Sequence, residues 1–372
     1  MNICTVISFC LLSLSLFLLT PKTLAYSVQK TIYVPTDYAT IQEAINHASL
    51  GDTIFVYNGS YHEHVTIDRS VSLVGQDMTT TIIDGDNTGT AVTIIQSNVN
   101  LTGFTLQHSG STYWGITLGS GASYNSITRN IVRNNSAGVQ INQFANNNSI
   151  IQNDLIDNQV YGVRLNSQSS SNLVSENNVS RTEFEGISID ESSDNVISKN
   201  SIVSNAKGII LYDDTTDNRI FENNIKSNGV GIVIEPPGGN VIYNNSFVDN
   251  SEQASISNYV NKGCVNTWDD GSRGNYWSDY TGVDSNGDGI GDTPYTIDKS
   301  DISKNQDRYP VVKGFFGGGL YWVPYLIVAV IAVIGSIIVG FLVRRRKRRA
   351  PNPLQGAHTP PPPTELSSCQ EM

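Results

Sequence analysis

Residues 186–208 read GISIDESSDNVISKNSIVSNAKG, and the same pattern recurs on both sides of this stretch. A glycine opens a short apolar run at positions 115, 138, 162, 186, 208 and 231, at intervals of 23, 24, 24, 22 and 23 residues. An asparagine follows each glycine nine or ten residues later, at 125, 148, 172, 195, 218 and 240. A second asparagine comes five residues after the first, at 130, 153, 177, 200, 223 and 245. Because an apolar residue lies two positions after each asparagine, the unit predicts three short strands separated by Asn or Gly corners.

Such a unit cannot bury its apolar face alone, so successive units must stack with like residues over like residues. We therefore predict an all-β fold, a right-handed, single-stranded parallel β-helix. The asparagines are predicted to take left-handed backbone angles at the corners and to donate their amides to the next coil. A leucine-rich repeat is the competing fold, but the units use Ile and Val and contain no helical return.

The composition agrees with a solenoid and excludes other classes. Of the 38 asparagines, 25 lie between residues 125 and 250, and Gly adds 32 residues, which disfavours a helical bundle. The formal charge of -11 argues against nucleic acid as a partner, since binding phosphates requires Lys and Arg. The four cysteines lie at 4, 10, 264 and 369 and allow no disulfide framework in the body. The oligomeric state is left open.

The region of residues 26–110 continues the pattern less regularly. Apolar residues at 41, 44, 45 and 48 predict a short amphipathic helix over 40–48 that covers the open N-terminal end of the stack. Strands are expected at 53–57, 64–67, 71–74, 81–83, 91–95 and 101–106. Regular repeats occupy 111–250, and a closing segment with an acidic loop occupies 251–319.

The two ends predict an exported, membrane-anchored protein. Residues 1–25 resemble a secretory signal cleaved after Ala25, although without a basic start an uncleaved anchor is the alternative. Residues 320–343 carry no charge and predict one transmembrane helix, followed by the basic block 344–349 and a Pro-rich tail to 372. The basic block places 344–372 in the cytoplasm and the body outside, as a single-pass cell-membrane protein. Residues 26–319 then hold 32 acidic and 16 basic side chains, a net charge of -16.

Three blocks of residues resemble the NosD-type, or CASH-type, β-helix proteins with the pectin-lyase-like fold. They are IQEAI at 41–45 with GDTI at 51–54, GSYHE at 59–63 with VSLVG at 71–75, and NYWSDY at 275–280 with DRYP at 307–310. The resemblance covers 31–310 and implies a scaffold that binds or processes carbohydrate, with a periplasmic role in copper-site maturation in the NosD branch. The chain departs from that last role in its predicted anchor and in lacking a Met- or His-rich copper cluster.

The acidic loop resembles a calcium site. Asp284, Asn286, Asp288, Ile290 and Asp292 stand at positions 1, 3, 5, 7 and 9 of an EF-hand-like pattern with Gly at position 6. Tyr295 replaces the expected Glu at position 12, so the site would be completed from elsewhere, for example by Asp279 or Asp307. A plain acidic turn is the alternative interpretation.

A second candidate site follows from the stacking. Acidic residues gather just after the Gly-led strands, and carboxylates one coil apart would stand about 5 Å from each other, the spacing of retaining glycosidases. Arg164 on a neighbouring coil is a candidate for holding a sugar acid. The candidate catalytic residues are Asp190, Glu191, Asp213, Asp214, Glu235 and Arg164. A solvated acidic corner or a cation site is the alternative interpretation.

Exposed aromatic residues near the same strands favour sugar binding, since sugars present both CH faces and hydroxyls. The candidate ligand-binding residues are Tyr113, Trp114, Tyr161, Phe184 and Tyr212. We therefore favour a surface protein that binds carbohydrate or cell-surface glycan. A polysaccharide lyase or hydrolase, a structural or adhesive protein and a copper-site maturation factor are the alternatives. His62 and His64 flank Glu63 on what reads as one strand face, and we interpret them as surface residues.

Overall fold

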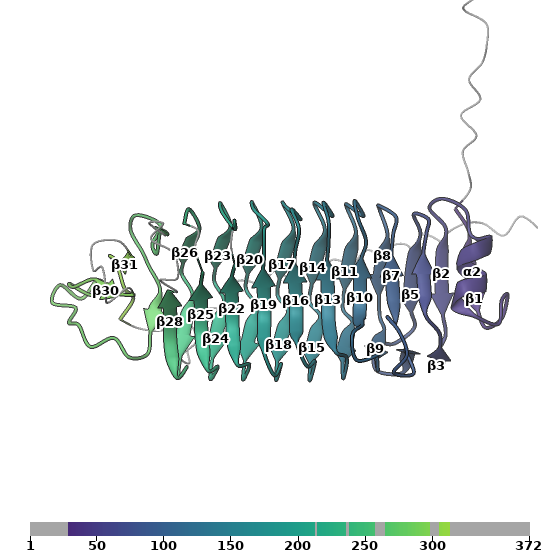
Figure 1. Cartoon of the computed structure of the whole chain (residues 1–372), viewed down its shortest axis with the longest axis horizontal. Coiled ribbons are helices and arrows are strands. Elements are labelled where there is room, and N and C mark those ends of the chain that lie inside the picture. The colour runs from purple at the N-terminus through teal and green to yellow at the C-terminus, as the bar shows by residue number, and fades with distance from the viewer. Residues whose placement is uncertain (1–28, 213, 236–237, 257–264, 298–304, 313–372) are drawn as a thin grey trace, which may run out of the picture. The chain divides into compact units, whose positions relative to one another are not determined.

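The computed structural model describes residues 29–212, 214–235, 238–256, 265–297 and 305–312, all within one compact unit, Met1–Phe316. Three parallel sheets wind around a common axis as a right-handed parallel β-helix (Figure 1), so the predicted fold is confirmed. From β2 to β28 each coil contributes one strand to each sheet, and neighbouring coils pair in register.

The strands fall into three long sheets and one short one. Sheet A contains β1 (Thr31–Val34), β2 (Thr53–Val56), β5 (Ser72–Gly75), β8 (Asn100–Thr102), β11 (Ser126–Thr128), β14 (Ser149–Ile151), β17 (Leu173–Ser175), β20 (Val196–Ser198), β23 (Arg219–Phe221) and β26 (Val241–Tyr243). Sheet B contains β3 (Gly59–His62), β6 (Thr81–Asp84), β9 (Thr105–Gln107), β12 (Ile131–Arg133), β15 (Asp154–Ile156), β18 (Asn178–Ser180), β21 (Ser201–Val203), β24 (Asn224–Lys226), β27 (Ser246–Val248) and β29 (Tyr276–Trp277). Sheet C contains β4 (Val65–Ile67), β7 (Val92–Ile94), β10 (Trp114–Leu118), β13 (Ala137–Ile141), β16 (Tyr161–Leu165), β19 (Glu185–Ile189), β22 (Lys207–Leu211), β25 (Val230–Ile234) and β28 (Glu252–Ile256). The short antiparallel pair is β30 (Tyr295–Thr296) and β31 (Gln306–Asp307).

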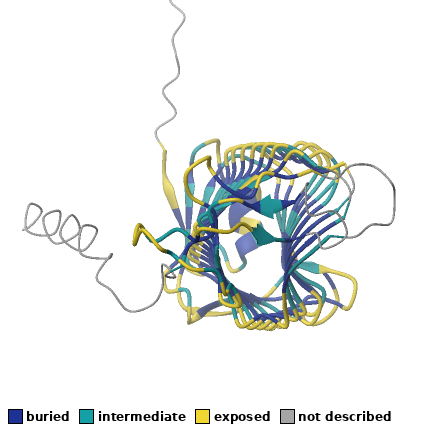
Figure 2. Ribbon diagram, turned by 90° about the vertical axis from the view of Figure 1, so that its left-hand side faces the viewer, coloured by how far each residue is buried: buried dark blue, intermediate teal, exposed yellow. Residues whose placement is uncertain are grey.

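The core is built from stacked columns of aliphatic side chains. In sheet A, for example, the central residues Ile127, Ile150 and Val174 of three successive strands pair in register and are fully buried. Burying one such side chain contributes about 1.5–3 kcal/mol. Figure 2 shows buried residues lining the inside of the coils and exposed residues at the corners.

Asparagine ladders run along the corners, as predicted. Asn177 donates its Nδ2 to Asn200 Oδ1 at 3.0 Å, and Asn200 donates in the same way to Asn223 at 2.9 Å. The column at 148, 172, 195, 218, 240 and 266 repeats this bond. A third ladder, which the sequence analysis missed, includes Asn205, Asn228 and Asn250. These buried amides satisfy backbone groups that the corners leave unpaired.

The prediction that the ladder asparagines take left-handed backbone angles is wrong. The residue before most of them takes that conformation, as Lys199 does before Asn200 with φ 57° and Glu222 does before Asn223 with φ 57°. The physical reason is that the ladder amide must point inward to reach the next coil and a backbone carbonyl. The sharp turn therefore falls on the preceding residue, whose side chain faces solvent and can be of almost any type.

The helix predicted over 40–48 is present as α2 (Ile41–His47) and lies beside β1 and β2 at the N-terminal end of the sheets (Figure 1). Its Ile41, Ala44 and Ile45 are buried against the first strands. The side chain of Thr40 accepts the amide of Glu43, and the Glu63 carboxylate accepts the amides of Ile41 and Gln42 at 2.9 and 3.0 Å. These acceptors satisfy amides that have no partner within the helix.

The N-terminal strands differ from prediction in several places, and the strands β1 and β3 were not predicted. The expected strand over 101–106 is two strands, β8 and β9, because Gly103 turns the chain with φ 85°. His64 lies after the end of β3, and its ring contacts Thr88 and Thr90, whereas His62 contacts Asp86. The expectation that His62 and His64 share one strand face is therefore wrong, because the chain turns between β3 and β4.

The closing segment covers the C-terminal end of the core with aromatic rings. Trp277 stacks on Phe247 at 4.4 Å between ring centroids and on Tyr295 at 4.3 Å. Asp307 is fully buried and accepts the Asn275 amide at 2.6 Å and the Trp277 indole N–H at 2.8 Å. Thus two parts of the block that resembles NosD-type proteins, NYWSDY and DRYP, bind each other directly.

No helix in the described part of the chain is long and apolar enough to cross a membrane. The predicted signal at 1–25, transmembrane helix at 320–343 and basic tail at 344–372 lie outside the described residues.

Candidate functional site

Five of the predicted catalytic and ligand-binding residues lie on the outer face of sheet C or just after its strands: Trp114, Tyr161, Arg164, Asp190 and Tyr212. Its strands are five residues long in the regular repeats and carry Gly at the second position. A Cβ on Gly162 would lie 2.5 Å from the carbonyl oxygen of Gly186 and 2.5 Å from Val179 Cγ1, so no larger side chain fits there. Gly162 and Val163 pack toward the core. Tyr161 and Arg164 flank them and contact each other outside the core.

Register brings these outward positions into columns. Trp114, Ala137, Tyr161, Glu185 and Lys207 follow one another across successive coils at the start of the strands. We define the sheet C site as the outward residues of this column and of the adjoining columns that contact one another or have a charged or hydroxyl side chain. They are Trp114, Tyr161, Arg164, Glu185, Ser188, Asp190, Lys207 and Tyr212.

An aromatic pair forms one end of the sheet C site. Trp114 and Tyr161 are two coils apart, yet their rings stack with centroids 5.5 Å apart and planes at 8°. The residue between them is Ala137, which is small enough to let the two rings lean together. Stacked rings of this kind present an apolar surface with a polar edge.

Arg164 links the aromatic pair to the acidic residues. Its guanidinium lies over the Tyr161 ring at 4.9 Å, donates to the Tyr161 hydroxyl at 3.2 Å and contacts Asp190 Oδ2 at 2.7 Å. Both members of the Arg164–Asp190 pair are partly buried. A planar guanidinium held on a ring is well suited to recognise hydroxyl or carboxylate oxygens.

Glu185 forms the other end of the site. Its side chain is nine-tenths buried, accepts the Tyr212 hydroxyl at Oε1 and lies 3.8 Å from Lys207 Nζ. Burial, followed by the hydrogen bond to Glu185, raises the pKa of Tyr212, so its hydroxyl stays protonated at neutral pH. Tyr212 is therefore a fixed hydrogen-bond donor to Glu185.

Three buried polar atoms of the sheet C site have no hydrogen-bond partner: Arg164 Nε, Glu185 Oε2 and Ser188 Oγ. An unsatisfied buried polar group costs about 1–3 kcal/mol, so such groups are rare in folded proteins. The three atoms belong to the paired strands β16 and β19. Three further atoms of this kind in the described residues, Asn125 Nδ2, Thr182 Oγ1 and Asn244 Oδ1, lie outside the sheet C site.

The other predicted catalytic residues separate from this face. Glu191 and Asp214 line a pocket of about 490 Å³ at the adjoining corner, together with Gln168, Ser170 and Ser193. Glu235 follows β25, and its negative charge contributes to the raised pKa of Tyr212. Asp213 lies outside the described residues.

The remaining predicted aromatic residues take no part in the stacked pair. Tyr113 is 46% exposed and Phe184 is 58% exposed, each one residue before a strand of sheet C.

Sequence reasoning missed Glu185, Ser188 and Lys207. Their signal was available in the register, because each occupies the same position relative to the repeat Gly as Tyr161 or Arg164. The acidic candidates were sought at positions four and later after the Gly, and only aromatic residues were considered at the position before it. Only the contacts show that this preceding residue faces outward.

The predicted calcium loop folds around its own amides. Asp284 accepts the amides of Gly287, Asp288 and Gly289 at 2.8, 3.1 and 2.9 Å, and Asp292 accepts that of Ser285 at 3.0 Å.

The two residues suggested as further calcium ligands are bound to other groups. Asp279 accepts the Tyr295 hydroxyl at 3.2 Å, and Asp307 is buried behind Trp277. The calcium site stays a prediction.

Comparison with known structures shows the fold. XylC, solved in complex with xylose, is 10% identical, with 64% of this chain and 71% of that chain covered and a TM-score of 0.50. Pectate lyase Pel9A is 15% identical, with 66% and 81% covered and a TM-score of 0.45.

Sequence comparison identifies the family. The probable ABC transporter binding protein NosD of Stutzerimonas stutzeri is 41% identical over 78 residues, 20% of this chain and only 16% of that protein's length. A family model described as periplasmic copper-binding protein (NosD) matches residues 45–224 and 161–282. These matches span well over half of the chain, and the protein therefore belongs to the NosD family.

Proposed function

We propose that this protein is an exported NosD-family β-helix that binds carbohydrate at the sheet C site. The observation that carries the proposal is the stacked Trp114–Tyr161 pair beside Arg164 and Glu185, whose Nε and Oε2 atoms lack partners. Aromatic rings pack against the CH faces of sugars, while charged and hydroxyl groups pair with sugar hydroxyls. Small shifts of Arg164 and Glu185 would give a sugar the hydrogen bonds that these atoms lack.

The charge of the body favours a neutral glycan over a polyuronate. Residues 26–319 carry a net charge of -16, which repels polyanions. The cations of the site, Arg164 and Lys207, are each already beside a carboxylate. A neutral sugar can use both ion pairs without breaking them.

The test compares two outward aromatic clusters on one protein. Trp114→Ala and Tyr161→Ala in the full-length protein should each weaken binding of neutral oligosaccharides on a glycan array by about tenfold, because each removes half of the stacked surface. Tyr243→Ala is the matched control: Tyr243 stacks on Phe221 at 5.3 Å on sheet A, and its hydroxyl accepts from Arg219 at 2.9 Å. Equal losses in all three variants, or no binding by the parent protein, would refute the proposal.

Catalysis is the second candidate, favoured by the pocket that Glu191 and Asp214 line beside the sheet C site. A glycoside hydrolase or lyase would release product from a bound oligosaccharide. Glu191→Gln and Asp214→Asn would then abolish release while leaving binding at the aromatic pair intact. Binding without any product, measured by chromatography over extended incubation, supports the binding function instead.

We also propose that 320–343 anchors the protein in the membrane with the β-helix outside. The uncharged stretch and the basic block after it support this arrangement. Membranes washed with alkaline carbonate should retain the full-length chain, and protease added to intact cells should remove the β-helix. Release by carbonate would contradict the anchor.

A calcium ion at Asp284, Asn286, Asp288, Ile290 and Asp292 is a further part of the proposal, supported by the spacing of oxygen ligands. A ligand bound only by the folded state stabilises it by about 2.7 kcal/mol at 100 times its Kd. Chelation should therefore lower the Tm, and Asp284→Asn with Asp288→Asn should remove the heat of calcium binding in titration calorimetry. An unchanged Tm together with no heat would exclude calcium.

A further inference from the structure

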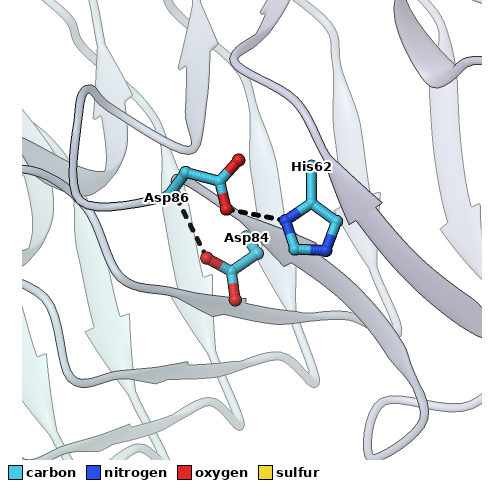
Figure 3. Close-up of side chains that lie close together, drawn as sticks. All are labelled: His62, Asp84 and Asp86. Carbon is cyan, nitrogen blue, oxygen red and sulfur yellow. Dashed lines mark hydrogen bonds and ion pairs between the residues drawn. The ribbon is translucent and has the colours of Figure 1, made fainter.

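A histidine and two aspartates converge near the N-terminal end of sheet B. One ligand atom from each of His62, Asp84 and Asp86 lies within 4.8 Å of the other two, and within the described residues this is the group of three His, Cys, Asp or Glu side chains that does so. Figure 3 shows the Asp86 carboxylate facing the His62 ring, with the Asp84 carboxylate beside them and one of its oxygens turned toward the Asp86 backbone. His62 ends β3 and pairs in register with Asp84 at the end of β6, and the turn after β6 brings Asp86 back toward them.

Asp84 is held in place by neighbours that are not in this group. Its Oδ2 accepts from Gln107 Nε2 at 2.8 Å and lies 2.9 Å from His108 Nδ1, and its Oδ1 accepts the Asp86 amide at 3.0 Å. The Asp84 residue is only 8% exposed. Carboxylates that bind metal are oriented by outer hydrogen bonds of this kind.

The contacts already hold the imidazole and the carboxylates next to one another. His62 Nδ1 lies 2.6 Å from Asp86 Oδ1. A divalent cation bound by the three side chains would be coordinated by one imidazole nitrogen and two carboxylates, whose negative charge it would compensate.

The donor types select the kind of ion. One imidazole nitrogen and two carboxylate oxygens suit borderline divalent ions, whereas Ca²⁺ and Mg²⁺ prefer oxygen alone and Cu⁺ prefers sulfur. A copper-binding role in the family is therefore compatible with this group for Cu²⁺ and incompatible with it for Cu⁺. His62 and Asp86 have side chains 59% and 50% exposed, so a fourth position stays open to solvent.

We propose that His62, Asp84 and Asp86 form an exchangeable binding site for a borderline divalent transition-metal ion such as Cu²⁺ or Zn²⁺, with Gln107 and His108 positioning Asp84. The site is separate from the sheet C site in the chain and uses different side chains. His62, which the sequence alone indicated to be a surface residue, is one of the three ligands of this proposed site.

The test is titration calorimetry of the full-length protein in detergent with Cu²⁺, Zn²⁺ and Ca²⁺. His62→Ala and Asp86→Asn should each weaken Cu²⁺ and Zn²⁺ binding at one site by at least the roughly 10–100-fold seen when only a supporting residue is lost. His108→Ala should weaken binding by about tenfold. Ca²⁺ should not compete at this site.

His64→Ala is the matched control, because His64 is also exposed but contacts Thr88 and Thr90. It should leave the affinity unchanged. Electron paramagnetic resonance of the Cu²⁺-loaded protein should show coupling to one imidazole nitrogen, lost in His62→Ala and kept in His64→Ala. Unchanged affinity in His62→Ala and Asp86→Asn, or equal losses in His64→Ala, would overturn the proposal, and circular dichroism would confirm that each variant is folded.

Discussion

The regular coils between Asn125 and Asn250 and the closing segment of residues 265–312 bury their polar groups by different means. In the coils most ladder amides bond the equivalent asparagine in the next coil, and no charge is involved. In the closing segment the last coil has no successor, and the Asp307 carboxylate takes the place of the next asparagine by accepting the Asn275 amide. The ladders within the coils are therefore satisfied by neutral groups, while the column that reaches Asn275 ends on an ionisable group.

The largest expected effect lies in the closing segment. Trp277→Ala removes a ring that is 1% exposed and stacks on both Phe247 and Tyr295, and we expect a loss of about 3–5 kcal/mol in the free energy of unfolding. Urea denaturation followed by tryptophan fluorescence measures it. Tyr276→Ala on the same strand, where the side chain is only partly buried, is the control and should cost far less. Equal losses would mean that the closing segment does not depend on this aromatic stack.

A single ladder position in the coils should have the next largest effect. Asn200→Ala leaves the Asn177 amide, the Asn177 side chain and the Val174 carbonyl without their buried partner. At about 1–3 kcal/mol for each unsatisfied group and with partial relaxation, we expect a loss of about 3 kcal/mol. Asn178→Ala, on the solvent side of β18, is the matched control and should change the free energy by less than about 0.5 kcal/mol.

A pH titration separates the two regions. Burial raises the pKa of Asp307 from 3.8 to about 6, although hydrogen bonds from Asn275, Trp277 and Tyr309 act in the opposite direction. The folded state thus holds the proton more tightly than the unfolded state. Its contribution to stability is fully present below about pH 4 and is lost as the pH rises to about 6. The change amounts to at most about 3 kcal/mol.

Urea denaturation of the parent protein and Asp307→Asn at several pH values between 4 and 7 isolates this contribution. The difference between the two proteins should change across that window, while Asn200→Ala should shift the whole curve without changing its slope. Asp269 does not confuse the comparison. Burial acts to raise the pKa of Asp269, but hydrogen bonds, the strongest of them from Arg308, lower it overall. The contribution of Asp269 to stability therefore changes below pH 4. A pH-independent difference would show that Asp307 does not titrate in this range.

The repeat could be predicted because each coil presents the same residue types to its neighbours. Gly162 shows why: the next coil's backbone leaves no room for a Cβ, so the glycine recurs at the same point of every turn. The left-handed position could not be predicted in the same way. It falls on Lys199, Glu222 and their equivalents, whose outward side chains vary and carry no periodic signal.

The sites were predicted only in part for a related reason. Residue type and spacing predicted five members of the sheet C site: Trp114, Tyr161, Arg164, Asp190 and Tyr212. Glu185 was not predicted, because an isolated Glu before a Gly is typical of a surface residue. In the structure its side chain is nine-tenths buried beside Tyr212 and Lys207. His62 is likewise a candidate metal ligand only because the fold places Asp84 and Asp86, 22 and 24 residues later in the chain, beside it.

The solenoid, its period and its asparagine ladders follow from the amino-acid sequence alone, because stacking identical units repeats each constraint at a fixed interval. Which outward side chains meet depends on the tertiary structure, since the outer columns are free to vary and contacts between them span one or two coils. The tertiary structure also decides how the stack ends. There the periodic constraint stops, and Trp277 and Asp307 replace the missing coil.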